Sequence, residues 1–487
     1  MAKSVKINYA LTLFDIFMGI AFPLLTMPYV ARILTPTNIG HVHFYLNILS
    51  YITLFVALGI PLYGVREIAK ERGNVAVRNK TAIELLVLHM ILTALGYFAV
   101  FILCFSVDKI KEDIPLFAIL SISLFFSTIG VSWFFQAIED FKYITIRSLI
   151  VKVISLILLF ALVRSREDII WYGVVLVCGS VGNNIFNFLR LRKYISWKDI
   201  NNNINPFKHV KPASKVFVLN LTIGIYTQLS VFLLGFLQSD ADVGYYTMAQ
   251  KIVAALNSIV LALTTVLLPR LSKYVGNRQE QEFNDLGNKA ISFVLAISLP
   301  ICVGLITLSR PIIMVLFGED YEPSIIVLII WAPIITIIGL SQIYGKSILY
   351  STGHEMLMTL CTFLGMITYI LVGIPGVKYF SIAGASVGSF CAELMVTGSM
   401  IFLGRHYHSC TFMRKQNLSY VVAGVTMFVV MSLCIQVSHN YYLQLIIGIP
   451  LGAISYMFIL KILRNDFYLE VEQILLKYLL NPKSKKQ

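Results

Sequence analysis

The stretch YALTLFDIFMGIAFPLLTMPYVARIL, residues 9–34, decides the fold class of this chain. It carries a single acid, Asp15, and one basic residue, Arg32, near its end. A helix of about 20 apolar residues crosses a hydrocarbon core of about 30 Å, so this stretch predicts a membrane span. Similar stretches recur almost without interruption as far as YYLQLIIGIPLGAISYMFIL, residues 441–460. We therefore expect an all-α, polytopic membrane protein with about fourteen transmembrane helices.

The composition supports a membrane protein. Hydrophobic residues make up 57% of the chain and charged residues 13%, whereas about 25% of the residues in a soluble domain are charged. The net charge is +14, but the basic residues stand in short breaks beside apolar spans, which indicates topology rather than nucleic-acid binding. Alternate breaks hold most of the 39 Lys and Arg residues. This bias predicts that those breaks and both termini are cytoplasmic.

The spans fall into groups that predict the domain organisation. The expected spans are residues 9–34, 40–62, 81–105, 114–135, 143–163 and 169–191, then 216–237, 243–268, 290–308, 324–344, 356–373 and 381–402, and finally 418–437 and 441–460. They predict an N-terminal six-helix lobe (1–191), a cytoplasmic linker (192–215), a C-terminal six-helix lobe (216–404), a basic loop with a final helix pair (405–464) and a cytoplasmic tail (465–487). No break is long enough to hold a catalytic domain, so we expect a transporter and not an enzyme.

Two parts of the chain resemble each other. NIG (residues 38–40) opens the second expected span, and DVG (residues 242–244) opens the eighth. Pro61 and Pro269 stand near the other ends of these spans, each close to a basic loop. Both spans enter from the same side, so they predict parallel repeats with a substrate site between the two halves. The alternative is a chance likeness between apolar helices.

Polar side chains inside the spans are the candidate site residues, because such residues usually face a cavity. His43 and Asn47 lie four residues apart and share one face of a helix. Thr247 and Lys251 have the same spacing in the second repeat, where Lys251 matches Asn47. The substrate-binding candidates are Lys251, Lys152, Arg32, Asn47, His43, Thr247, Asn187 and Asn220.

The cations among these candidates favour an anionic substrate in a hydrated cavity. The alternative is that the long side chains extend to the membrane surface, and for Arg147 and Lys346, near the ends of their spans, this is what we expect. Asp15 and Glu393 are candidates for a coupling proton or cation, with pairing to a lysine as the alternative.

No catalytic residue, cofactor or metal site is predicted. His406, His408 and Cys410 lie close together in sequence, but they stand in a basic loop. Such a loop more often holds solvated side chains than a metal ion.

Several motifs resemble those of the bacterial polysaccharide flippases, the Wzx-type members of the multidrug/oligosaccharidyl-lipid/polysaccharide exporter superfamily. They are PYVARIL (28–34), GVREIAK (64–70), WFFQAIEDFKYI (133–144), GYY (244–246) and LPRLS (268–272). The third is the most specific, and the resemblance covers essentially the whole chain.

The resemblance implies movement of an undecaprenyl-diphosphate-linked oligosaccharide from the cytoplasmic to the outer leaflet of the bacterial plasma membrane, by alternating access, for a surface polysaccharide such as O-antigen or capsule. Its expected partners are this substrate, membrane lipids, a polysaccharide polymerase and the chain-length machinery. It implies no particular sugar, driving force or oligomeric state. The alternatives are a multidrug exporter of the same superfamily, with Asp15 as coupling acid, a lipid II flippase, and a membrane enzyme such as a polymerase.

Overall fold

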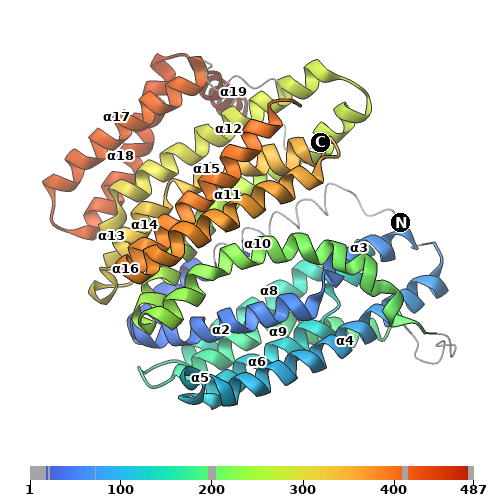
Figure 1. Cartoon of the computed structure of the whole chain (residues 1–487). Helices are drawn as coiled ribbons and strands as arrows, with labels where there is room; N and C mark the ends of the chain where they lie inside the picture. Colours follow the sequence, from blue (N-terminus) through green and yellow to red (C-terminus); the bar gives the residue numbers. More distant parts are fainter. Residues whose placement is uncertain (1–17, 20–21, 72, 196–203, 408–414, 481–487) are drawn as a thin grey trace. The chain divides into compact units, whose positions relative to one another are not determined.

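The computed structural model describes residues 18–19, 22–71, 73–195, 204–407 and 415–480, and all regular structure in this part is helical (Figure 1). Ten of the described helices are long and apolar enough to cross a membrane, or eleven with one bent pair. The polytopic all-α fold is therefore confirmed, while the count of fourteen stays a prediction. Part of the first predicted span lies outside the described residues. The predicted spans 356–373 and 381–402 both lie in α16 (Glu355–Gly404), whose backbone is not helical at Ser381, so α16 consists of two helices joined at a break. The two helices fold back on each other, because a Cβ atom on Gly388 would lie 2.5 Å from the Gly373 Cα atom.

The contacts of the chain form two compact units. Unit 1 is Met1–Thr247 with Val377–Ala385, and unit 2 is Met248–Gly376 with Ser386–Gln487. Unit 1 contains α2 (Pro36–Ala57), α3 (Ile60–Lys70), α4 (Val75–Ser106), α5 (Asp108–Lys111), α6 (Ile114–Ile129), α7 (Ser132–Ala137), α8 (Phe141–Leu162), α9 (Ile169–Leu191), η2 (Pro206–His209), α10 (Val210–Leu237) and the start of α11 (Asp240–Gly276). The lobe, linker and tail boundaries expected from the sequence stay a prediction.

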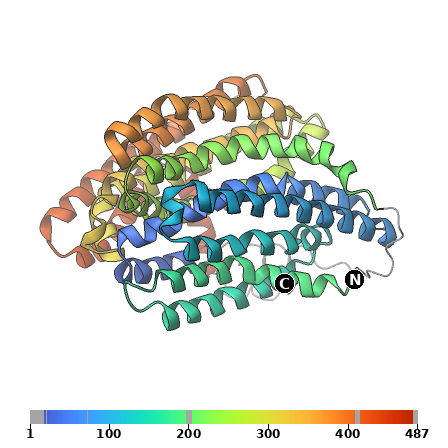
Figure 2. The ribbon, with the colours of Figure 1, turned by 60° about the horizontal axis from the view of Figure 1, so that its bottom comes forward.

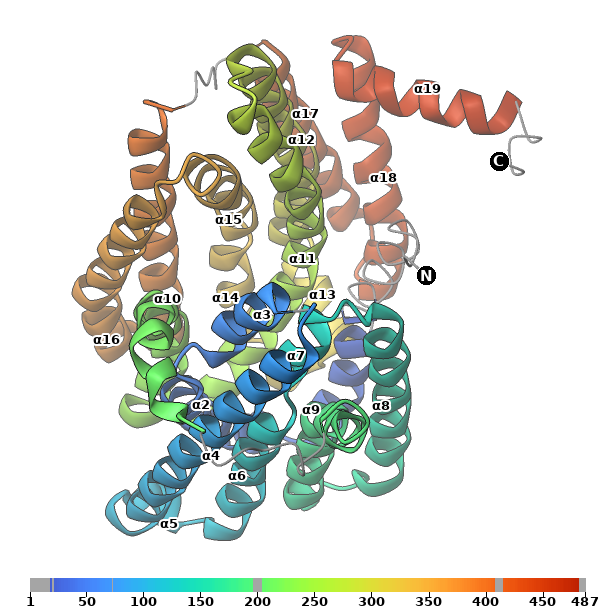
Figure 3. The same ribbon diagram turned by 90° about the vertical axis from the view of Figure 1, so that its right-hand side faces the viewer.

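Unit 2 begins within α11 and ends with the C-terminal helices. It contains α12 (Glu280–Thr307), α13 (Ser309–Leu316), η3 (Glu319–Tyr321), α14 (Ser324–Trp331), α15 (Ile334–Gln342), the π-helix η4 (Ile343–Leu349), most of α16, α17 (Lys415–Val437), α18 (Tyr441–Ile462) and α19 (Asp466–Leu480). The α17–α18 hairpin packs against α12, where the Tyr456 hydroxyl donates to the Ala296 carbonyl at 3.0 Å. Figure 3 shows α19 leaving the end of α18 at a steep angle.

Short polar residues set the helix starts of unit 1. Thr35 caps α2 by accepting from the Asn38 amide at 3.2 Å, and Pro36 follows at the first helical position. Asn74 and Asp113 cap α4 and α6 in the same way. These side chains satisfy backbone N–H groups that have no partner within the helix. Before α9, Asp168 accepts hydrogen bonds from Arg164 and Ser165, which hold the pKa of its carboxyl below the usual range.

The two glycines of the predicted repeat contact each other's helix. A Cβ atom on Gly40 of α2 would overlap the Asp240 carbonyl at the start of α11. A Cβ atom on Gly244 would overlap the Pro36 carbonyl at the start of α2. Asp240 and Pro36 each stand four residues before the glycine of their own segment. The contact is therefore reciprocal, as expected for two segments related by a two-fold axis, and only glycine allows the backbones to come so close.

The most specific sequence motif forms a packed cluster within unit 1. Trp133, Phe134 and Phe135 of α7 are buried, and the Trp133 ring covers Gly64 of α3, where an added Cβ atom would lie 2.9 Å from the ring. The GVREIAK and WFFQAIEDFKYI segments thus lie against each other. Their residues hold α3 and α7 together, so these motifs are packing elements.

Candidate functional site

The candidate site is a hollow of about 280 Å³ among α2, α6 and α9, three helices of unit 1 that pack against one another. Figures 1 and 2 show these helices running alongside each other. Its polar lining comes from Ser50 and Thr53 of α2, Ser123 and Ser127 of α6, and Ser180 and Asn184 of α9. Its apolar lining comes from Leu46, Leu49, Val177 and Val181. We call this the hydroxyl pocket.

The hydroxyl groups of the pocket are held in one orientation by their own helices. The Ser123 and Ser127 hydroxyls each donate to a carbonyl three residues earlier at 2.7 Å, and the Thr53 hydroxyl donates to the Leu49 carbonyl at 2.8 Å. Ser50 and Ser180 make the same kind of bond. A serine that donates its proton to backbone retains oxygen lone pairs as acceptors. The pocket therefore presents acceptor oxygens beside the apolar side chains of the same helices.

Asn184 adds an amide to these hydroxyls, and Gly130 makes room for it. A Cβ atom at Gly130 would overlap the Asn184 amide oxygen, so a larger residue there would displace the asparagine. Hydroxyl acceptors together with an amide donor suit an uncharged ligand with many hydroxyl groups. All lining residues are uncharged, so the pocket offers no counter-ion for a phosphate or a cationic drug.

Three of the predicted site residues are buried and have a polar atom with no partner among the residues that the structure describes. Asn47 is 4% exposed and donates to the Gln228 carbonyl at 3.1 Å and to its side-chain oxygen at 2.9 Å, while Asn47 Oδ1 is unsatisfied. Thr247 Oγ1 and Asn187 Nδ2 are likewise buried and unsatisfied. Such atoms are costly unless water or a ligand reaches them.

The expectation that Arg147 extends to the membrane surface is wrong. Its side chain is only 8% exposed and donates to Asn183 Oδ1 at 3.1 Å and to Asn187 Oδ1. The guanidinium also lies 5.4 Å from the Tyr143 ring centroid. The asparagines of α9 supply the acceptors that make burial possible, because a buried charge needs hydrogen-bond partners. Asn187 is therefore a partner of Arg147 in α8.

None of the predicted site residues is among those that line the hydroxyl pocket. Lys152, Lys251, His43 and Glu393 are half-buried, on α8, α11, α2 and α16, and Arg32 is exposed. Asn220 lies in α10, but its side chain is outside the described part of the chain, as is all of Asp15. Their roles in binding or coupling stay predictions.

A charged cluster that the sequence analysis missed joins five segments of unit 1. His41 Nδ1 lies 2.9 Å from Asp240 Oδ2, and its Nε2 lies 4.0 Å from Asp113 Oδ2. Lys109 Nζ lies 2.5 Å from Asp240 Oδ1 and donates to the Gly235 carbonyl at 2.6 Å. This His41 cluster fixes the ends of α10 and α11 to α2, α5 and α6. Its members are far apart in sequence, so spacing alone gave no signal.

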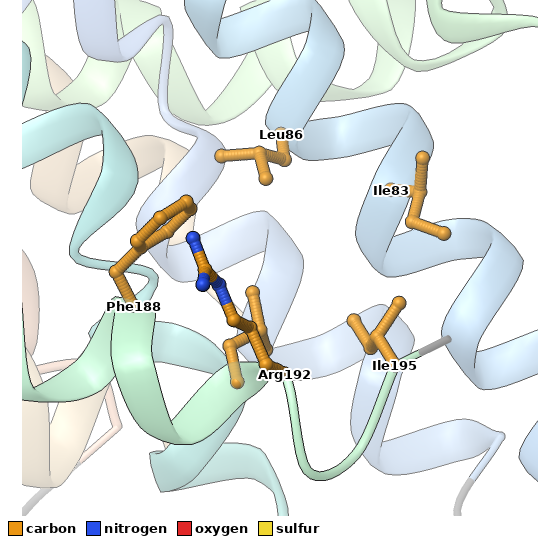
Figure 4. Close-up of a pocket in the computed structure, with 6 residues that line it drawn as sticks. Ile83, Leu86, Phe188, Arg192 and Ile195 are labelled. Atoms are coloured by element: carbon orange, nitrogen blue, oxygen red, sulfur yellow. The ribbon is translucent and has the colours of Figure 1, made fainter. Parts of the chain in front are cut away.

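Glu84 of α4 is fully buried and pairs with the segment around η2. Its carboxylate lies 2.6 Å from Lys208 Nζ and 3.1 Å from His209 Nε2, and it accepts from the Asn205 amide at 3.0 Å. These contacts fix η2 to α4. The nearby hollow in Figure 4, lined by Ile83, Leu86, Phe188, Leu191, Arg192 and Ile195, has a volume of about 10 Å³. That is room for about one water molecule and excludes a ligand.

The comparisons with known proteins identify the family. The family model described as "Polysaccharide biosynthesis protein" matches residues 8–275, which is more than half of the chain. The chain belongs to the polysaccharide biosynthesis protein family. The resemblance drawn from the sequence motifs is thereby confirmed.

Two relatives of this chain share one description. A Shigella dysenteriae protein described as an O-antigen transporter is 26% identical over 391 residues, which cover 78% of this chain and 95% of the relative. A protein of Escherichia coli strain K12 with that description is 24% identical, covering 79% and 92%. Among solved structures, the lipid II flippase MurJ in an inward closed conformation has a TM-score of 0.76 at 17% identity, covering 96% of this chain and 99% of that one. This likeness shows a shared fold.

Proposed function

We propose that this chain is a flippase that moves a lipid-linked oligosaccharide across the membrane. The family membership and the relatives described as O-antigen transporters support this function. The polytopic helical fold, which it shares with a lipid II flippase, is consistent with a transporter and not with an enzyme.

The hydroxyl pocket is the observation that carries the proposal at the level of structure. A lipid-linked oligosaccharide has sugars that are poorly solvated by hydrocarbon and a lipid that is well solvated by it. Sugar hydroxyls are donors, and the serine and threonine oxygens of the pocket are acceptors. Burial of polar groups without such partners is unfavourable by several kcal/mol, on the order of 2–7 per group. The pocket on α2, α6 and α9 is therefore our proposed sugar contact in unit 1.

The diphosphate requires cations, which the hydroxyl pocket lacks. We assign this role to Lys251, Lys152 and Arg32, and we assign coupling to Asp15 or Glu393. The lipid is undecaprenyl, and the direction is from the cytoplasmic to the outer leaflet of the plasma membrane, by alternating access. The product serves a surface polysaccharide such as O-antigen or capsule, with the polymerase and chain-length machinery as the next partners.

The alternatives differ in the chemistry of their substrates. A multidrug exporter for cations needs acidic groups in its binding site, whereas the hydroxyl pocket is lined by neutral residues. A lipid II flippase shares the fold and differs in the sugar headgroup it carries. Accumulation of one precursor or the other in a strain that lacks the gene separates these two functions.

The test of the pocket is to fill it without altering charge. Ser127→Leu places an apolar side chain in the hollow and removes an acceptor, and we expect it to reduce transport on the order of tenfold, as steric misfit in a pocket does. Ser455→Leu on α18 is the matched control, because Ser455 is also half-buried and donates three residues back, to the Gly452 carbonyl at 2.8 Å. The readout is polysaccharide display at equal membrane protein levels. Equal transport by the two variants would show that the hydroxyl pocket does not contact the substrate during transport.

A further inference from the structure

Unit 2 contains a second and chemically different pocket. It has a volume of about 580 Å³ and lies where three breaks between helices meet. These breaks are the turn between α11 and α12, the turn before α16, and the end of α16. All three stand in the set of basic breaks that the sequence predicts to be cytoplasmic. The lining includes Arg278, Gln279, Asn284, Thr352, Arg405 and His406.

Two arginines make this pocket cationic. Arg278 and Arg405 both line it, and the lining contains one carboxylate, that of Glu280. Among the residues that the structure describes, neither guanidinium forms an ion pair. With two guanidinium groups and one carboxylate, the lining has an excess of positive charge, which attracts an anion. The planar donor arrangement of the guanidinium groups matches a phosphate, which they bind through paired hydrogen bonds.

Local structure fixes the backbone of Arg278 and the side chain of Arg405. The backbone of Arg278 is left-handed, with φ 56°, and its amide donates to the Val275 carbonyl at 3.1 Å to close the end of α11. The Arg405 guanidinium lies 4.0 Å from the centroid of the Phe402 ring, one turn earlier in α16. This cation–π contact limits the orientations of the side chain.

The size and the remaining polar groups indicate more than a bare anion. A volume of about 580 Å³ lies in the usual range of small-molecule sites, roughly 300–1,000 Å³. Gln279 and Asn284 place amide groups beside the arginines, and Thr352 adds a hydroxyl. These groups suit the polar alcohol of a phosphate ester. The basic pocket also lies at the ends of apolar helices, where phosphate groups of lipids are found.

We propose that this pocket of unit 2 binds a phosphate ester, with Arg278 and Arg405 holding the phosphate. The site goes beyond the proposed transport function and does not rest on it. The phosphate has two sources, the headgroup of an anionic phospholipid and a water-soluble phosphate ester.

The test uses the full chain in nanodiscs and measures binding directly. In phosphatidylcholine discs, glycerol 1-phosphate is titrated by calorimetry as the soluble probe. In parallel, phosphatidylglycerol is added to the discs, and its residence on the protein is measured by native mass spectrometry. Binding in the first arm identifies a soluble ester, and binding confined to the second identifies a lipid headgroup.

The variants are Arg278→Gln, Arg405→Gln and the pair. Each single change is expected to weaken binding about tenfold or more, since charge-assisted hydrogen bonds are lost. Arg278→Lys keeps the charge and should retain part of the binding. Arg464→Gln is the matched control, because Arg464 also follows a spanning helix with a left-handed backbone, φ 49°, and does not line the pocket. The melting temperature of each variant in discs reports its folding.

Loss of binding in the pocket variants, with Arg464→Gln unchanged, supports the site whichever probe binds. The proposal is overturned if neither probe binds the wild-type chain, or if the double variant binds as the wild type does. These experiments measure binding and not transport. Neither result therefore bears on the proposed flippase function, which has a separate test.

Discussion

At the scale of single residues, the cations within spanning helices are the most expensive groups to place in this chain. Lys251 is half-buried in α11, four residues after the buried Thr247. Insertion scales put a lysine at the centre of a membrane helix at about 2.5–3.5 kcal/mol. A hydrated cavity or a bound phosphate lowers this cost, and the diphosphate that we propose as part of the substrate would give the charge a function.

We therefore expect Lys251→Ala to insert normally and transport poorly, and Lys251→Arg to keep part of the activity because the charge is retained. Polysaccharide display at matched membrane protein levels measures both. Lys152→Ala should behave in the same way. Transport by Lys251→Ala at the wild-type level would show that the ammonium only extends to the membrane surface.

Single residues also show what can be predicted from residue spacing along one helix. Asn47 was found from its depth and helix face, and it is indeed buried with a polar partner on α10. The pairings of His41 and Arg147 could not be predicted, because their partners come from segments distant in sequence. Periodicity reports the face of a helix, whereas pairing depends on which helices become neighbours.

At the scale of helices, the close approach of α2 and α11 depends on Gly40 and Gly244. We expect Gly40→Ala and Gly244→Ala each to lower the free energy of unfolding by about 1–3 kcal/mol, the usual penalty of overpacking. Each added methyl group would overlap a backbone carbonyl that cannot rotate away. Thermal unfolding in detergent, alongside transport, is the measurement.

Gly398→Ala in α16 is the control for these substitutions. A Cβ atom there meets nothing within 4 Å in the described part of the chain, and alanine favours a helix by about 1 kcal/mol over glycine. It should be neutral or slightly stabilising. If all three variants melt alike, the reciprocal glycine contact does not hold the two helix starts together.

The helices that form the hydroxyl pocket could be predicted from the sequence, but the pocket itself could not. The existence of most spans follows from hydropathy, since apolar stretches of this length have few other stable structures. Ser123 and Ser127 stand four residues apart, as do Ser180 and Asn184, so each pair shares one face of its helix. This spacing does not show that the two faces meet. Only the packing of α6 against α9 and α2 brings their oxygens around one hollow.

At the scale of the whole molecule, the distribution of basic residues predicts the orientation in the membrane. We expect both termini to be cytoplasmic and the segment 240–242 to be external, since cytoplasmic breaks collect Lys and Arg. Reporter fusions after Gln487 and within 240–242 should give signals from opposite compartments. Reporter signals from the same compartment at both positions would refute the orientation. They would also refute the predicted cytoplasmic location of the pocket of unit 2 that Arg278 and Arg405 line.

The transport direction is the central claim about the whole chain. The most direct measurement is leaflet-resolved labelling of the lipid-linked sugar in a strain that lacks this gene, with and without the gene restored. We predict that the labelled oligosaccharide stays in the cytoplasmic leaflet without the protein, and that restoring the protein returns it to the outer leaflet together with the surface polysaccharide. Normal outer-leaflet display in the deletion strain would contradict the flippase assignment.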